Sequence, residues 1–584
     1  MEKLNGMYNG NKALTWAADF ETTVEIQYLI EGKVRVYCWA VECLEYPELK
    51  ARGETIEEFF NFFRDKSATI YFHNLKFDGL YILDYLLRNN YPSYAYQFKD
   101  KPKEPHVESM IDGHGQVYKI ELHDKPTRLY FLDSSKKYRM PLEDVAKIFG
   151  IPGKTELLLG YRPIGREVTD WEWERVENDV RILAEAMRFQ ASQGLNKITV
   201  ASDAKDAYVN LTGPALIGKR HPRLSYEDDA RLRPAYRGGE VYLNPKYKEK
   251  VISDVWVFDE TSKYPAIMKG VRGELLPRGM PRLVDEDYEL QENEVDIWDI
   301  DCNLFLKEDK IPWVHYKNSP GHLNSEFIIE EEEPINLMLS TPDMEMFHEC
   351  YYCTEFNFNN RYVFWAEAGQ FSEYIDHWIA IKNKASQEKN GGMRQLAKDM
   401  MNNLSGRFAL NPDRKEKIPY FDPKEDKIKF NENLKQTQPW YVPTSIFITA
   451  YGRKRIIQDA MALGSDFVYM DTDSLHLINY EKHRDYLDPL IGEDKLGYYK
   501  LEDCWKWAKY IRSKAYLHED SWIHPKDIEV KCGGLPKDAK KKVDMQNFYI
   551  GSELDGKLAG RTVPGGYLLK ETTYKIQSGG RWTF

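Results

Sequence analysis

The chain has 584 residues, of which 42% are hydrophobic and 30% charged, and its formal net charge is −12. This length is too great for one hydrophobic core, so we expect several domains. Residues 1–18 lack the apolar core of a signal peptide, and no apolar run approaches the roughly 18 residues of a membrane span, so we expect neither secretion nor a membrane anchor. Seven cysteines in so long a chain favour reduced thiols and a cytosolic compartment.

The negative charge is unevenly distributed along the chain. Seven of the twelve residues from 285 to 296 are acidic, and residues 330–333 form an unbroken acidic run. Basic residues gather between 382 and 407, at 453–455 and at 537–542. Because phosphate binding depends on such local clusters, the net charge does not exclude a nucleic acid as a partner.

Acidic residues recur at the ends of apolar segments in the first 200 residues. In "WAADFETT", Asp19 and Glu21 end an apolar run, and "VRVYCWAVECL" predicts an antiparallel neighbouring strand. Asp78 lies near the start of an apolar helix in "HNLKFDGLYILDYLL", and Asp179 lies on the flank of the core face of a helix in "WERVENDVRILAEAM". A carboxylate in that position needs a partner, which a metal ion would supply. Each acid alone also fits a helix cap or a surface position, but all four together fit a two-metal nuclease.

A second set of carboxylates lies farther along the chain. "VWVFDETSKYPAIM" has an apolar strand that ends in Asp259, and in "FVYMDTDSLHLINY" two strand-like runs meet at Asp471 and Asp473. Residues i and i+2 of an extended segment point to one side, and the pattern predicts a hairpin with the acids at its tip. Such oxygen ligands suit Mg²⁺, and two ions roughly 4 Å apart can activate an attacking oxygen and stabilise a leaving one. For "DETS" alone, a polar turn after a core strand is an equally good interpretation.

Between these segments, "MRQLAKDMMNNLSGRF" predicts an amphipathic helix. Its apolar face packs on the protein, while its basic face suits a triphosphate beside a two-metal site or, alternatively, is merely solvated. The apolar face contains Leu396, Met400 and Leu404, and the basic face contains Arg394, Lys398 and Asn402.

These segments, in this order, resemble a family B DNA polymerase, specifically the protein-primed enzymes of small phages of the phi-29 type. "DFETT", "HNLKFDG" and "NDVRILAEA" resemble the three exonuclease motifs, and "DETSKYP", "KDMMNNLSG" and "YMDTDS" resemble polymerase motifs A, B and C. "YRGG" resembles the linker between the two activities, "KAY" the Lys-x-Tyr motif, and "VKCGG" and "VPGGYLL" the C-terminal part. The resemblance covers nearly the whole chain.

The resemblance implies a role for each matching residue of the polymerase. Asp259 and Asp473 would hold two metal ions, with Asp471 close by and the main-chain carbonyl of Glu260 as a further ligand. Tyr264 would lie under the incoming sugar and reject a 2′-hydroxyl. The remaining contacts with nucleotide, primer or template would come from Lys382, Arg394, Lys398, Asn402, Lys514, Tyr516, Tyr236, Arg237, Gly238 and Gly239.

For the exonuclease, the resemblance implies that the four acids Asp19, Glu21, Asp78 and Asp179 bind metal ions and that Lys154 assists hydrolysis. The frayed 3′ end would be held by Thr22, His73, Asn74, Phe77 and Ser134. Three residues depart from the family pattern, and they put fidelity and exonuclease rate in doubt. Ser405 and Arg175 each replace a common Tyr, and Ala515 replaces a common Thr.

The expected fold is a multidomain α/β protein, with an RNase-H-like 3′–5′ exonuclease followed by a right-hand polymerase with two insertions. We expect the exonuclease at 1–199, the palm at 200–270 and 442–532, the insertions at 271–369 and 410–441, the fingers at 370–409, and the thumb at 533–584. In the second insertion, "KIPYFDPKEDKIKFNE" predicts a projecting β-hairpin. Similar insertions in the family contact the terminal protein and encircle DNA, although either segment could be a passive surface excursion.

The expected function is a viral replicative DNA polymerase that is primed by a terminal protein, proofreads and displaces strands. It would use two Mg²⁺ ions per active site, with Mn²⁺ as a substitute, and act as a monomer on primer-template DNA and deoxynucleoside triphosphates in the cytoplasm of a bacterial host. An RNA-copying polymerase is one alternative, but Thr472 separates acids that are adjacent in such enzymes. A DNA-end-binding factor with a decayed polymerase centre is another, but it predicts damaged metal acids, and none is missing.

Overall fold

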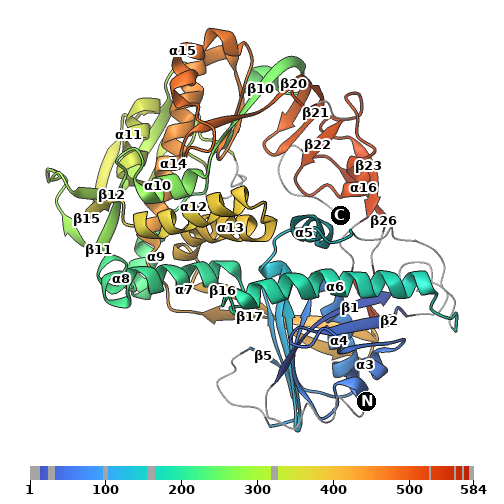
Figure 1. The fold of residues 1–584 in the computed structure, drawn as a ribbon. Coiled ribbons are helices and arrows are strands. Elements are labelled where there is room, and N and C mark those ends of the chain that lie inside the picture. The colour runs from blue at the N-terminus through green and yellow to red at the C-terminus, as the bar shows by residue number, and fades with distance from the viewer. Residues whose placement is uncertain are drawn as a thin grey trace.

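The computed structural model describes residues 13–23, 33–96, 103–153, 165–316, 326–524, 528–557, 561–568 and 571–577. In Figure 1 the N-terminal sheet lies at the bottom, helices α6 (Asp170–Ser192) and α7 (Val200–Thr212) cross the middle, and most of the second half of the chain lies above them. None of the helices in these ranges combines the length and the hydropathy that a membrane crossing needs.

The N-terminal domain, called the exonuclease domain below after the activity predicted for it, is built on an eight-stranded sheet of order β3-β2-β1-β4-β8-β7-β6-β5. Strand β1 (Leu14–Thr22) is antiparallel to β2 (Val36–Cys43), as predicted, and parallel to β4 (Ser67–Phe72). Because both faces are covered, β1 is apolar on both: Trp16 joins the core cluster beneath α4 (Leu75–Arg88), and Ala17 joins the cluster under α6. The other elements are β3 (Lys50–Gly53), α3 (Ile56–Phe62), β5 (Ser93–Ala95), β6 (His106–Ile111), β7 (Val117–Asp124), β8 (Thr127–Asp133) and α5 (Leu142–Phe149).

Helix α6 begins in a capping box, in which Thr169 accepts a hydrogen bond from the Glu172 main chain and the Glu172 carboxylate accepts one from Thr169. Its apolar stripe packs against the sheet and is buried as the sequence predicted, with members Val176, Val180, Leu183 and Met187. Asp179, beside this stripe, is only 1% exposed. The burial of that stripe therefore carries a carboxylate into the interior, close to the end of β1.

The segments predicted as the palm, and called the palm below, contain an antiparallel seven-stranded sheet of order β22-β21-β20-β10-β19-β18-β9. Helix α14 (Val442–Leu463) covers one face, where Ile456 and Ile457 join Phe258 and Met470 in one apolar cluster. The strands are β9 (Val241–Leu243), β10 (Val251–Glu260), β18 (Phe467–Asp471), β19 (Ser474–Leu477), β20 (Tyr499–Arg512), β21 (Ala515–Ser521) and β22 (Glu529–Cys532). Helices α8 (Pro214–Arg220) and α9 (Tyr226–Leu232) precede the first of these strands, and α10 (Lys263–Lys269) and α15 (Arg484–Leu487) lie in segments between them.

The two segments expected as insertions form sheets of their own. The first contains β11 (Leu275–Val284), β12 (Glu294–Leu306), β13 (Glu330–Ser340), β14 (Tyr351–Tyr352) and β15 (Phe356–Ala368), with helix α11 (Thr341–Cys350). The second is an antiparallel hairpin of β16 (Asp413–Asp422) and β17 (Lys427–Gln436), as its sequence predicted. This hairpin contacts the exonuclease domain, since Lys435 donates to the Tyr96 carbonyl and Arg88 pairs with Asp426.

Helices α12 (Ser372–Gln387) and α13 (Gly391–Phe408) lie side by side between the palm and α7 (Figure 1). The C-terminal elements are α16 (Lys537–Lys540), β23 (Glu553–Lys557), β24 (Arg561–Val563), β25 (Gly566–Leu568) and β26 (Glu571–Lys575). Strand β25 returns to the exonuclease domain, where the Tyr81 hydroxyl on α4 donates to the Tyr567 carbonyl at 2.8 Å. The last part of the chain therefore bridges back to the first.

Candidate active sites

The palm carboxylates lie where two neighbouring strands meet. Asp259, at the end of β10, is opposite Ser474 of β19, and the Glu260 main-chain N–H donates to the Asp473 carbonyl at 2.8 Å. Burial, and after it the charge of Asp473, raises the pKa of Asp259 to about 7. Burial also raises the pKa of Asp473. The adjacency predicted for the two strand ends is confirmed, and both carboxylates are held in surroundings that disfavour their charge.

The tip of the β18–β19 hairpin differs from the extended geometry that the sequence predicted. Thr472 has φ of 60°, and the Asp473 main-chain N–H approaches the Asp471 carbonyl at 2.7 Å. Side chains do not alternate across such a tight turn, so the extended geometry expected for Asp471 and Asp473 is wrong. Asp471 is instead bound by the Lys514 ammonium at 2.8 and 2.9 Å, which leaves Asp259 and Asp473 as the facing pair.

A buried framework holds this turn in place. Lys263 donates to the Thr472 carbonyl at 2.7 Å and pairs with Glu260 at 3.4 Å, while Arg455 donates to Glu260 at 2.8 Å. The Glu260 side chain thus belongs to an ion-pair network. The metal ligand predicted for this residue is its main-chain carbonyl, which lies outside that network. Sequence reasoning missed Lys263, although it lies within the quoted motif "DETSKYP".

The "YRGG" segment packs directly on the hairpin tip. A Cβ atom on Gly239 would lie 2.7 Å from the Thr472 side chain and 2.9 Å from the Tyr264 hydroxyl, so only glycine fits there. Arg453 donates to the carbonyls of Arg237 and Gly238, both at 2.9 Å. The structure therefore brings this predicted segment against the carboxylates as a support for the turn.

The predicted two-faced helix is confirmed. On α13 the apolar residues Leu396, Met400 and Leu404 are buried, and Arg394, Lys398 and Asn402 are exposed. Burial, followed by the positive charge of Arg394, lowers the pKa of Lys382 on α12, and Lys398 acts on Asp259 by lowering its pKa. The basic face is thus directed toward the palm carboxylates.

Two predicted tyrosines flank the palm site from different elements. Tyr264, on α10, lies against Gly239 and Gly452, and burial raises its pKa to about 12. Tyr516, on β21, packs with its ring centroid 5.4 Å from that of Tyr469. Ser405, which replaces the tyrosine common in motif B, is 8% exposed, and its carbonyl accepts a hydrogen bond from Ser445 at 2.6 Å. Ser405 therefore helps to pack the helix and presents little surface.

The exonuclease carboxylates form a second centre. The ligand atoms of Asp19 and Glu21 on β1 and of Asp179 on α6 all lie within 4.8 Å of one another. Asp78, on α4, is buried as well but is not part of this close group. Three clustered carboxylates are the donor set that a hard divalent cation such as Mg²⁺ prefers, so these residues fit the metal site that the sequence predicted.

The residues expected to hold a 3′ end gather at the ends of the parallel strands β4 and β8. His73 Nδ1 lies 3.0 Å from Ser134 Oγ, and the Asn74 N–H donates to Asp133 at 3.0 Å from a left-handed conformation with φ of 72°. Phe77 packs its ring 5.9 Å from that of Tyr567, and Thr22 ends β1 beside the acids. Lys154 lies outside the described residues.

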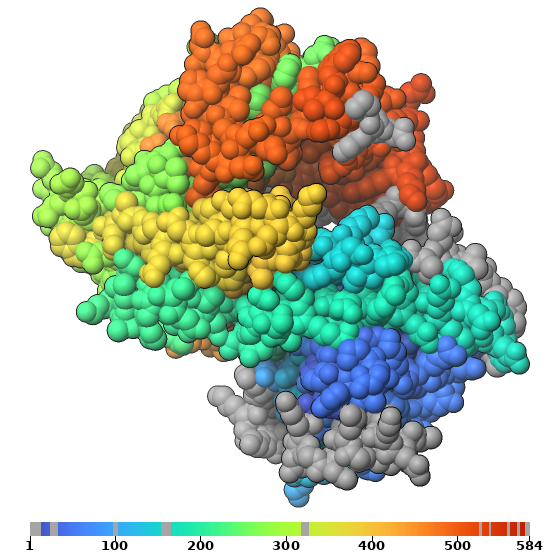
Figure 2. All heavy atoms as spheres, viewed as in Figure 1, coloured from blue at the N-terminus to red at the C-terminus, as the bar shows by residue number. Residues whose placement is uncertain are grey.

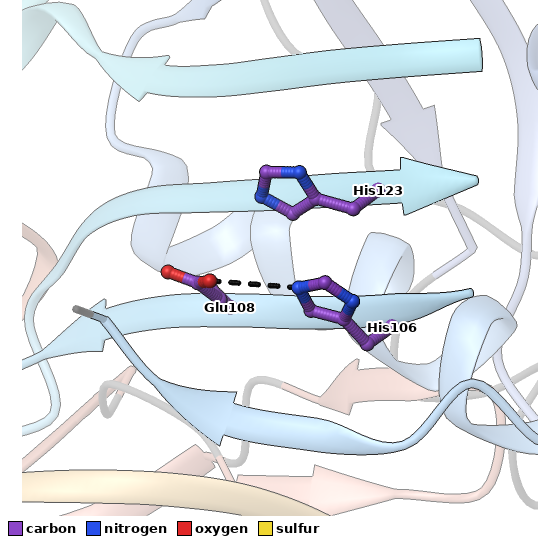
Figure 3. A group of neighbouring side chains, drawn as sticks. All are labelled: His106, Glu108 and His123. Atoms are coloured by element: carbon purple, nitrogen blue, oxygen red, sulfur yellow. Dashed lines mark ion pairs between the residues drawn. The ribbon is translucent and has the colours of Figure 1, made fainter. Parts of the chain in front are cut away.

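A further histidine and carboxylate cluster lies on β6 and β7 (Figure 3). The rings of His106 and His123 stack at 4.6 Å, and Glu108 lies beside His106. Arg128 donates to His123 Nδ1 at 2.8 Å, so the other ring nitrogen carries the proton and donates it to Glu121 at 2.9 Å. Because both nitrogens of His123 already have partners, the cluster serves as a hydrogen-bonded link between strands.

A cleft of about 1650 Å³ runs between the exonuclease domain, the hairpin and the palm. Burial, and next the charge of Arg414, lowers the pKa of Arg407, which shows how closely cations are gathered there. On another part of the surface, Figure 2 shows a hollow between α12 and α13 and the palm strands. The basic residues that line the cleft are Lys136, Arg139, Arg407, Arg414, Lys415 and Lys435.

Comparison with known proteins agrees with this arrangement. The family described as "DNA polymerase type B, organellar and viral" matches residues 161–488. The DNA polymerase of Bacillus phage B103 is 33% identical over 96% of this chain and 99% of its own, and that of Bacillus phage phi29 is 32% identical over the same shares. Phi29 DNA polymerase in complex with primer-template DNA and incoming nucleotides superposes with a TM-score of 0.87 at 31% identity, covering 97% of this chain and 100% of the other.

The fold and its two carboxylate centres define a DNA-directed DNA polymerase with a 3′–5′ exonuclease domain. The chain belongs to the family B DNA polymerases of the organellar and viral type, among the phi29-type phage enzymes. The predicted fold class is thereby confirmed, and divalent metal ions are the cofactors of this family.

Proposed function

We propose that this protein replicates a linear viral genome by extending a hydroxyl of a terminal protein, and that it proofreads and displaces strands by itself. The observation that supports this most directly is the proximity of two carboxylates, Asp259 at the end of β10 and Asp473 in the turn that leads into the neighbouring strand β19. The positive charge of Lys398 on α13 acts on Asp259 as well. Match over nearly the full length to protein-primed phage polymerases supports priming by a terminal protein.

In the polymerase centre, Asp259, Asp473 and the Glu260 carbonyl would hold two Mg²⁺ ions, with Mn²⁺ as a substitute. When bound, these ions supply activation of the primer 3′-hydroxyl and stabilisation of the departing pyrophosphate. Lys382, Arg394, Lys398 and Asn402 bind the triphosphate. Tyr264 limits the space under the sugar, and Lys514 and Tyr516 support the primer end.

In the exonuclease centre, Asp19, Glu21, Asp78 and Asp179 hold the metal ions, and Lys154 assists hydrolysis. His73 and Ser134 hold each other and thereby fix the loop after β4, so that Asn74, Phe77 and Thr22 can bind the frayed strand. The basic cleft receives the template, with Arg407 and Arg414 neutralised by its phosphates. The first insertion contacts the terminal protein, the hairpin encircles DNA, and the enzyme acts as a monomer in the host cytoplasm.

Two variants test this assignment by separating the activities. Asp473→Asn should abolish primer extension with Mg²⁺ while leaving 3′ digestion of single strands largely intact. Asp19→Ala combined with Glu21→Ala should do the reverse, because it removes two of the three clustered carboxylates. Primer extension and release of labelled 3′ nucleotides are measured on the same preparations. Extension near the wild-type rate by Asp473→Asn would exclude the palm assignment.

A further inference from the structure

Arg175 is a charged residue inside the exonuclease metal cluster. It lies on α6 one turn before Asp179, is 5% exposed, and forms an ion pair with Glu21 through its Nε atom. A permanent cation is thus in direct contact with a carboxylate of the cluster.

The three clustered carboxylates would repel one another without a cation. Asp19, Glu21 and Asp179 have their oxygens within 4.8 Å, and the guanidinium contacts Glu21 and acts electrostatically on the other two. Charge-assisted bonds of this kind are about twice as strong as neutral ones. Arg175 therefore stabilises the acid cluster before any metal ion arrives.

The same contact opposes metal binding. A divalent ion held by Glu21 shares this carboxylate with Arg175, which already binds its Oε1 atom, and the ion also meets the positive charge of the guanidinium at close range. Arginine does not lose its proton in proteins, so this opposition cannot be relieved by deprotonation. The ion must either displace the guanidinium or bind beside it with weaker coordination.

We propose that Arg175 competes with the catalytic metal ion for Glu21 and so lowers the affinity of the exonuclease site for divalent cations. It is a positioning residue that acts through Glu21, and it makes digestion more dependent on metal concentration than polymerisation is. The inference rests on the proposed function, in which these acids are the exonuclease metal site.

The experiment measures Mn²⁺ binding directly, by the electron paramagnetic resonance signal of the free ion. The polymerase centre is silenced in all samples with Asp259→Asn and Asp473→Asn, so that the exonuclease site dominates. In this background Arg175→Met, which keeps the side-chain length but not the charge, should bind Mn²⁺ roughly 10- to 100-fold more tightly. Arg175→Lys keeps the positive charge but not the forked set of donors, so its Mn²⁺ affinity should lie between those of the unsubstituted background and Arg175→Met.

A matched control removes the same charge from the same helix. Arg181 is exposed on α6 and donates to Asn178, away from the acid cluster, so Arg181→Met should leave Mn²⁺ affinity within about two-fold. As a second readout, the Mn²⁺ concentration for half-maximal 3′ digestion should fall in Arg175→Met. That measurement uses an otherwise wild-type chain.

The outcomes separate the inference from the function on which it rests. Suppose that Glu21→Gln weakens Mn²⁺ binding, while Arg175→Met has a native circular dichroism spectrum and binds Mn²⁺ no more tightly than the background. The proposed competition is then refuted, and the assignment of the exonuclease metal site stands. If Glu21→Gln leaves Mn²⁺ binding unaltered, the exonuclease site itself is misassigned. Equal gains in Arg175→Met and Arg181→Met would also refute the inference, because the effect would then be general charge and not contact with Glu21.

Discussion

Replacing Asp259 by asparagine should stabilise the metal-free protein while it destroys polymerisation. Burial, and next the Asp473 charge, raises the pKa of Asp259 to about 7, whereas an unfolded aspartate titrates near about 3.9. Between pH of about 3.9 and about 7, the folded protein keeps the Asp259 proton that the unfolded chain has released. The free energy of unfolding therefore falls as pH rises through this range and is constant above it. Relative to low pH, the free energy of unfolding is lower by about 2 kcal/mol at pH 5.5 and by about 4 kcal/mol at pH 8. These values are upper limits because the carboxyl is partly exposed.

Urea unfolding in the presence of a chelator, followed by tryptophan fluorescence, measures this difference. The excess stability of Asp259→Asn over the wild type should widen by up to about 2 kcal/mol between pH 5.5 and pH 8. The control is Asp254→Asn, an exposed acid on the same strand, for which no widening is expected. Mg²⁺ should stabilise the wild type more than Asp259→Asn, because the variant keeps only the exonuclease cluster of Asp19, Glu21 and Asp179 as a divalent-cation site. A variant less stable than the wild type, or a pH-independent difference, would refute the reasoning about buried repulsion.

Three further results are expected. Tyr264→Val should accept ribonucleotides more readily, because Tyr264 lies against Gly239, where we propose that it limits the space under the incoming sugar. An unchanged ratio of incorporation efficiencies for ribonucleotides and deoxyribonucleotides would contradict this role. Deletion of residues 414–436 should spare the filling of short gaps but impair displacement of a downstream strand. The two ends left by the deletion lie close together, because Asp413 is paired across the hairpin with Gln436, the last residue removed. Strand displacement equal to that of the wild type would show the hairpin to be dispensable. The Asp19→Ala and Glu21→Ala double variant should extend mismatched primers that the wild type first trims, and continued trimming would contradict the proofreading assignment.

The sequence predicted the carboxylates well because their placement depends on local pattern. An apolar run that ends in an acid gives a buried strand with a carboxylate at its edge, as in β1 and β10. The period of 3.6 residues likewise gave the buried face of α13 and the position of Asp179 on α6. The predicted hairpin with the acids at its tip is confirmed, but the extended geometry between Asp471 and Asp473 is not. Thr472 adopts a positive φ, which is uncommon for a β-branched residue and has no signal in the residue pattern.

The cations that balance these acids could not be predicted in the same way. Lys514 is 43 residues from Asp471, Arg455 is 195 residues from Glu260, and Arg175 is 154 residues from Glu21. Long, flexible side chains reach their partners from any neighbouring element, so their pairing is decided by tertiary packing and leaves no local spacing to read.

These distant cations explain why both carboxylate centres can fold without a bound metal ion. Each buried carboxylate raises the free energy of the fold unless a cation lies nearby. In the palm the balance comes from Lys263 and Lys398 around Asp259 and Asp473, while Lys514 pairs with Asp471. In the exonuclease, Arg175 contacts Glu21 itself. A cation beside the pair leaves the ligand oxygens accessible, whereas a cation bound to a ligand oxygen is either displaced by the metal ion or weakens its coordination. For this reason we expect the two sites to differ in metal affinity although both are built from carboxylates.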